Sequence, residues 1–155
     1  MTADQRRTDQ PVDRRKASRG GRRTTDRAGR HPVVLVADSD DFARRPCVQF
    51  LTRRGFMVCE ASAGTDAAAA LGVMRPRVAV VDEALPAART LVPAAQAAGI
   101  PLIVMTTDFM ANPTGAAAVL IKPFPLSTML AHLRRILHHL DAANESPRGD
   151  SVPVA

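Results

Sequence analysis

The chain has 155 residues and is 46% hydrophobic, which is enough for one globular domain with a substantial core. Its formal net charge of +6 at pH 7 suggests nucleic-acid binding by the folded domain only if the charge lies on that domain. No apolar run approaches the length of a membrane span, and the N-terminus has no apolar signal segment. These features argue against an integral membrane protein, and we expect a cytoplasmic location.

The excess positive charge is confined to the first 31 residues. Residues 1–31 contain ten Lys and Arg against four acidic residues, whereas the rest of the chain contains eleven of each sign. The segment has no apolar periodicity, so we predict a disordered basic tail. Charge alone would let it bind nucleic acid or anionic lipid, but it has no aromatic side chains to stack on bases. Ordinary solvated disorder is the simpler interpretation.

The first half of the remaining chain alternates apolar runs with helical patterns. A strand is predicted over 33–37 and a helix over 41–54. Pro46 falls within this helix, so we expect the helix to start late or to bend there. A second strand is predicted over 56–59 and a second helix over 64–74.

The second half continues the alternation with one exception. Strands are predicted over 78–81, 102–105 and 117–121, with an Ala-rich helix over 87–98. Pro93 lies in this helix, so its first half is expected to be irregular. The stretch 107–116 contains turn residues and leaves little room for a regular helix. We therefore expect strands joined by right-handed crossovers in a parallel sheet, with one helix short or missing.

The last helix is predicted over 126–140 because its apolar residues recur at helical spacing along one stripe. The stripe consists of Leu126, Met129, Leu130, Leu133, Ile136, Leu137 and Leu140. The segment 141–155 is polar and contains two prolines, so we predict a flexible C-terminal tail. The domain itself is predicted to span 32–140.

Four of the apolar runs end on a reactive polar residue. Asp38, Asp82, Thr106 and Lys122 each follow a run rich in Val, Leu or Ile. Runs of this kind are typical of strands buried on both faces. The carboxyl ends of parallel strands share one edge of a sheet, where open α/β proteins place their sites. The sequence therefore predicts that two carboxylates, a hydroxyl and an ammonium meet in one crevice.

Residues 32–140 resemble the receiver domain of two-component response regulators, the CheY-like domain. The resemblance rests on four motifs in order, namely Asp38-Ser39-Asp40-Asp41, Asp82-Glu83-Ala84-Leu85-Pro86, Thr106-Thr107 and Lys122-Pro123-Phe124. It implies an α/β fold with a flavodoxin-like, doubly wound, five-stranded parallel sheet of order 2-1-3-4-5.

The resemblance also implies a role for each strand-end residue. Asp82 would be the phosphoacceptor, Asp38 a carboxylate ligand of Mg²⁺, Thr106 the switch hydroxyl and Lys122 the phosphate contact. The backbone carbonyl of Ala84 would complete the metal site, and the bond before Pro123 would be cis. A divalent cation suits such a site because a carboxylate and a phosphoryl group repel one another until their charge is neutralised.

The chain departs from the family in its metal ligands. Ser39 stands where the family usually has a second acid, so we expect weaker Mg²⁺ binding. Asp40 or Asp41 could supply the missing carboxylate, although a shift by one or two residues redirects the side chain.

A second departure lies in the switch region. Asp82 and Thr106 are 24 positions apart, and Thr106 and Lys122 are 16 apart, which is shorter than usual in the family. Val119 occupies the usual aromatic switch position. The connection that normally reports phosphorylation is therefore truncated.

Two readings of the function follow. In the first, the protein is a stand-alone receiver and not a conventional enzyme, with at most weak self-dephosphorylation. It would take its phosphoryl group from a histidine kinase or phosphotransfer protein and signal by protein contact, with a homodimer as one option. In the second, it is a degenerate receiver that acts as an interaction module without phosphorylation. Nucleic-acid binding through residues 1–31 is a separate, added hypothesis.

The remaining ligand-type residues have simple structural interpretations. Cys47 and Cys59 lie within predicted elements without metal-like spacing, so we expect buried, reduced thiols. His132, His138 and His139 lie on the last helix, and His132 is not at helical contact spacing from the other two. We interpret them as surface histidines.

Overall fold

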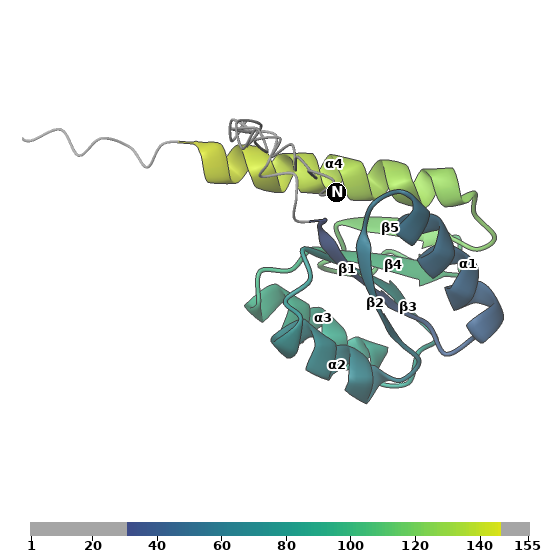
Figure 1. The fold of residues 1–155 in the computed structure, drawn as a ribbon. Helices are drawn as coiled ribbons and strands as arrows, with labels where there is room; N and C mark the ends of the chain where they lie inside the picture. Colours follow the sequence, from purple (N-terminus) through teal and green to yellow (C-terminus); the bar gives the residue numbers. More distant parts are fainter. Residues whose placement is uncertain (1–30, 147–155) are drawn as a thin grey trace, which may run out of the picture. The chain divides into compact units, whose positions relative to one another are not determined.

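The computed structural model describes residues 31–146 (Figure 1). They form one five-stranded sheet of order β2-β1-β3-β4-β5, in which every neighbouring pair is parallel. The predicted α/β fold and strand order are confirmed. In chain order, the elements are β1 (Val33–Ala37), α1 (Asp41–Arg53), β2 (Met57–Ala61), α2 (Gly64–Val73), β3 (Val78–Asp82), α3 (Ala88–Ala97), β4 (Leu102–Thr106), β5 (Ala118–Ile121) and α4 (Leu126–Glu145). The predicted basic tail, apart from His31, lies outside the described residues.

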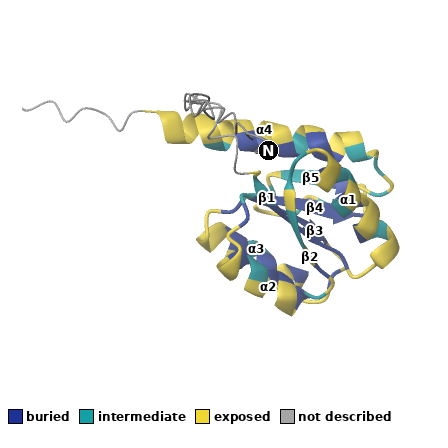
Figure 2. Cartoon of the chain, viewed as in Figure 1, coloured by how far each residue is buried: buried dark blue, intermediate teal, exposed yellow. Residues whose placement is uncertain are grey.

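The alternation of side chains along the strands creates two separate cores. Val34 and Val36 of β1 face α1 and α4, whereas Leu35 and Ala37 face α2 and α3. Figure 2 shows the central strands buried between these two helical layers. Burial on both faces explains why the strands of the sequence are continuous apolar runs. It also leaves the sheet's carboxyl edge as the place where polar side chains can gather.

Both internal prolines lie inside helices. Helix α1 does not start late, which leaves the bend as the remaining expectation at Pro46, and the irregular first half expected for α3 is wrong. Pro46 and Pro93 are each the sixth residue of their helix, in α1 and α3. A proline there removes one ladder hydrogen bond close to the N-terminus, where water can solvate the freed carbonyl. In α1 the side chain of Asp40 also caps the first turn by accepting from the amide of Phe42 at 2.9 Å.

Other element ends differ modestly from the predicted ones. Strand β2 begins one residue later than expected and continues to Ala61. Helix α4 runs past the predicted end at residue 140 to Glu145, so the expected start of the C-terminal tail lies inside a helix. An ion pair of 2.7 Å between Arg77 and Asp141 anchors the added segment. The predicted end rested on the spacing of apolar residues, which cannot reveal a polar contact of this kind.

The connection between β4 and β5 contains no helix, as the spacing predicted. Residues 107–117 form turns and irregular backbone. After β3, the chain turns through Ala87, which has φ of 66°, a conformation that favours glycine. Gly64 at the start of α2 lies directly against this turn, since a Cβ there would be 2.1 Å from the carbonyl oxygen of Pro86.

Within residues 31–146, none of the helices combines the length and the apolar character that crossing a membrane requires.

Candidate functional site

The ends of β1, β3 and β5 bring an ammonium group to two carboxylates. Asp38 directly follows β1, Asp82 is the last residue of β3, and Lys122 directly follows β5. The Nζ atom of Lys122 lies 2.8 Å from Oδ2 of Asp38 and 3.3 Å from Oδ1 of Asp82. The structure thus places these three predicted site residues in direct contact.

Burial makes this charge arrangement energetically important. Asp38 is 1% exposed and Asp82 7%, so each carboxylate depends on a nearby cation rather than on water. Burial lowers the pKa of Lys122, but the hydrogen bond and charge of Asp38, together with Asp82, outweigh this and raise the pKa above its usual value. The ammonium is therefore firmly protonated near neutral pH.

A cavity of about 200 Å³ opens beside this group. It is lined by Asp82, Glu83, Ala84, Thr106, Thr107 and Lys122. The lining thus includes the predicted acceptor Asp82, the predicted switch residue Thr106, the ammonium of Lys122 and Ala84, whose carbonyl is the predicted metal ligand. Asp38 is not part of the lining and contacts the cavity residue Lys122.

Thr106, at the end of β4, is held by contacts other than Asp82. Its hydroxyl donates to Oε2 of Glu83 at 2.5 Å and accepts from the amide of Asp108 at 3.0 Å. The residue is only 3% exposed. Its carbonyl accepts from the amide of Lys122 at 2.7 Å, which ties the two strand ends together.

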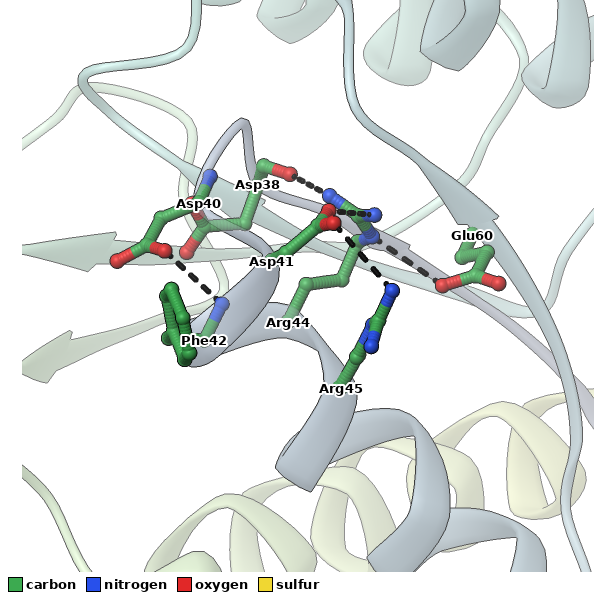
Figure 3. A network of polar contacts seen from close by, with 7 residues as sticks. All are labelled: Asp38, Asp40, Asp41, Phe42, Arg44, Arg45 and Glu60. Atoms are coloured by element: carbon green, nitrogen blue, oxygen red, sulfur yellow. Dashed lines mark hydrogen bonds and ion pairs between the residues drawn. The ribbon is translucent and has the colours of Figure 1, made fainter.

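The acidic side chains of the loop after β1 are engaged by nearby backbone amides and by arginines of α1 (Figure 3). The amide of Asp40 donates to Oδ1 of Asp38 at 2.9 Å, and the carboxylate of Asp40 caps α1. Asp41 forms ion pairs with Arg44 and Arg45 of the same helix. Ser39 is exposed at the bend between strand and helix.

Arg44 is the centre of this network (Figure 3). Its Nη1 donates to the carbonyl of Asp38 at 2.6 Å, its Nε pairs with Glu60 of β2 at 3.2 Å, and its Nη2 contacts Asp41. The side chain is 10% exposed. A buried guanidinium therefore fixes the loop that carries Asp38 to the neighbouring strand.

Sequence reasoning assigned no role to Glu83 or Arg44. The spacing of Asp41 and Arg44 does indicate a helical ion pair. The contact of Arg44 with Glu60 and that of Glu83 with Thr106 depend on the packing of separate strands, for which the sequence has no local signal.

The donor set fits a Mg²⁺ ion held mainly by phosphate and water. Mg²⁺ in proteins commonly takes one or two carboxylates and completes its shell with water and substrate oxygens. Asp38 and Asp82 surround one ammonium, so two carboxylates are close together. Across residues 31–146, no group of three His, Cys, Asp or Glu side chains is arranged to hold a metal.

The other sequence-predicted positions have simpler surroundings. The Lys122–Pro123 peptide bond is cis, and Val119 is half-buried in β5. Cys47 is buried as expected, whereas Cys59 on the edge strand β2 is only half-buried, so the expected burial is wrong for Cys59. Neither forms a disulfide. Burial raises the pKa of both thiols, which keeps them protonated and unreactive near neutral pH.

No protein-family model matches the sequence, and no curated protein matches it significantly. Solved structures do match. The signal receiver domain of an HD domain-containing protein from Pseudomonas fluorescens Pf-5 has a TM-score of 0.66 and 22% identity, covering 73% of this chain and 99% of that one. A CheY-like receiver domain protein from Methanospirillum hungatei JF-1 has a TM-score of 0.66 and 21% identity, with coverage of 73% and 98%.

A third match is a response regulator from Burkholderia pseudomallei whose structure contains a phosphorylated aspartic acid, a calcium ion and citrate. It has a TM-score of 0.58 and 21% identity, covering 76% of this chain and 75% of that one. At these identities the similarity establishes the fold. The described domain has the receiver fold.

Proposed function

We propose that this protein is a two-component receiver that accepts a phosphoryl group on Asp82 and signals through protein contacts. The observation that carries the proposal is the contact of one ammonium, that of Lys122, with both Asp38 and Asp82 at the edge of a receiver-type sheet. The neighbouring cavity of about 200 Å³ leaves room for a phosphoryl group. The phosphorylated aspartic acid in the Burkholderia structure is consistent with this chemistry.

In the proposed reaction, a carboxylate oxygen of Asp82 attacks the phosphorus atom of a phosphorylated histidine. A new O–P bond forms, the N–P bond breaks, and the imidazole of the donor leaves with the electron pair and takes up a proton. Lys122 would then turn from the carboxylates toward a phosphoryl oxygen, where a fixed positive charge stabilises the charge of the transferred group.

Mg²⁺ is the cation we expect at this site. Asp38, Asp82 and the carbonyl of Ala84 would hold it, and the bound cation would neutralise the repulsion between carboxylate and phosphoryl group. Asp40 is engaged as the cap of α1 and Asp41 pairs with arginines. Neither is therefore a ready substitute for the acid that Ser39 replaces, so we expect weak affinity.

The phosphodonor would be a histidine kinase or a phosphotransfer protein, and the output would be contact with another protein. Phe42 in α1 and Phe109 and Met110 in the loop after β4 are 92%, 79% and 75% exposed. Large apolar side chains this exposed are suited to protein contacts.

The test is to incubate the protein with acetyl phosphate and Mg²⁺ and to measure its intact mass. The proposal expects one added phosphoryl group, which Asp82→Ala abolishes and Asp66→Asn, a change at an exposed acid of α2, leaves intact. The absence of any added group at saturating Mg²⁺ would refute the proposal.

Ser39→Asp should strengthen Mg²⁺ binding in calorimetry.

A degenerate receiver is the second candidate. It is favoured by the absence of a helix between β4 and β5, because this connection ordinarily reports phosphorylation. In this case the mass would not change, while the exposed apolar residues would still mediate contact with a partner.

A further inference from the structure

The Thr106 hydroxyl has a single proton, and it already donates this proton in a hydrogen bond to Glu83. A hydroxyl donates one hydrogen bond and accepts others. Here it donates to Glu83 at 2.5 Å and accepts from the Asp108 amide at 3.0 Å. At 3% exposure, Thr106 has almost no access to water. A phosphoryl oxygen on Asp82 could therefore receive this proton only if Glu83 released it.

The backbone of Glu83 is fixed to the sheet, whereas its side chain is exposed and held by the contact with Thr106. Its amide donates to the carbonyl of Met105 at 2.8 Å, which anchors the residue to the end of β4. The side chain is exposed and lines the same cavity as Asp82 and Lys122. The carboxylate can thus leave Thr106 for water without disturbing the sheet.

We propose that Glu83 is a built-in competitor that keeps the hydrogen bond of the Thr106 hydroxyl for itself and so opposes the response to phosphorylation of Asp82. The inference rests on the proposed function, since it describes how that site is regulated. An ionised acceptor forms a stronger hydrogen bond than a neutral one. A phosphoryl group must displace it before Thr106 can respond, so the threshold for switching is set by a residue next to the acceptor.

The first experiment examines the contact itself in the unphosphorylated protein. NMR shifts of the Asp108 amide and the Thr106 methyl group are compared in wild type, Glu83→Ala and Glu145→Ala. Glu145 lies in the last turn of α4 and controls for the loss of one negative charge. The proposal expects both signals to move in Glu83→Ala and to stay in place in Glu145→Ala. Unchanged signals in Glu83→Ala would overturn it.

The second experiment measures the competition with beryllium fluoride, a phosphoryl analogue, in the presence of Mg²⁺. Glu83→Ala should bind it about tenfold more tightly than wild type, the factor expected from one charge-assisted hydrogen bond. In a Thr106→Val background the same change should give little gain, because there is no proton left to compete for.

The outcomes separate this inference from the proposed function. A gain of equal size in the Thr106→Val background would mean that Glu83 acts by charge alone and would overturn the inference. Equal affinity of wild type and Glu83→Ala would do the same while leaving phosphorylation of Asp82 intact. If neither protein binds the analogue or gains mass with acetyl phosphate, the proposed function fails, and the regulatory role of Glu83 fails with it.

Discussion

Lys122 is the residue on which the electrostatics of the site depend. It is the single side-chain cation in contact with Asp38 and Asp82 among the ion pairs of the described part of the chain. Removing one partner of a buried pair leaves the other charge without compensation, which costs more than the pair itself contributes. The ammonium therefore stabilises the resting protein in addition to its proposed contact with a phosphoryl group.

We expect Lys122→Met to lower the free energy of unfolding by about 2 to 3 kcal/mol at pH 7, which is less than for a fully buried pair because the lysine is partly exposed. The pKa of Lys122 is raised in the folded protein. Its contribution is therefore fully present below the unfolded value of about 10.4 and is lost as the pH rises through the folded value. Urea unfolding at pH 7 and pH 11 should show the difference between wild type and variant shrinking.

The chain makes this titration easy to assign. It contains no tyrosine, and its one other lysine is Lys16, in the basic tail. Cys47 and Cys59 also titrate at alkaline pH. The effect of Cys59 cancels in the comparison, whereas the charge of Lys122 lowers the pKa of Cys47, so wild type and variant are best compared in a Cys47→Ala background. A difference that is equal at both pH values would contradict the role assigned to Lys122.

At the scale of elements, Arg44 joins the loop after β1 to α1 and β2. Its three contacts belong to a side chain that is 10% exposed, whereas Arg45 pairs with the same Asp41 at 3.5 Å and is 71% exposed. We expect Arg44→Gln to cost about 2 kcal/mol, because buried hydrogen bonds to charged groups are lost. Arg45→Gln should cost less than about 0.5 kcal/mol, as exposed ion pairs do. Equal midpoints in urea would contradict this assignment.

The two glycines of α2 provide a second matched pair. A Cβ at Gly64 would lie 2.1 Å from the Pro86 carbonyl oxygen, whereas one at Gly72 would meet nothing within 4 Å. We expect Gly64→Ala to destabilise the protein by at least about 2 kcal/mol, because the turn after β3 must move. Gly72→Ala should stabilise it by about 0.5 to 1 kcal/mol through helix propensity. Thermal unfolding of both variants checks the signs, and a harmless Gly64→Ala would contradict the close approach.

For the whole molecule, the predictable features are those that recur along the sequence or follow one another in a fixed order. Strands buried on both faces appear as apolar runs, and their parallel order explains why Asp38, Asp82 and Lys122 meet. Contacts between side chains of different elements were not predictable, as Glu83 and Arg44 illustrate. The predictions made from the prolines of α1 and α3 failed because the rule used treats all interior positions of a helix alike. Near the start of a helix, water readily replaces the hydrogen bond that a proline removes.

The charge distribution divides the chain into a basic segment and a balanced domain. Residues 1–31 carry all of the formal net charge of +6, so any affinity for DNA should be electrostatic and located there. We expect full-length protein to bind DNA weakly at low salt, with affinity falling steeply as salt is added. Deletion of residues 1–31 should abolish this binding in a mobility-shift assay. We expect the thermal midpoint to stay unchanged, because within the described residues 31–146 the buried core residues lie between Val34 and Leu137. Binding that survives the deletion would place the DNA contact on the receiver domain instead.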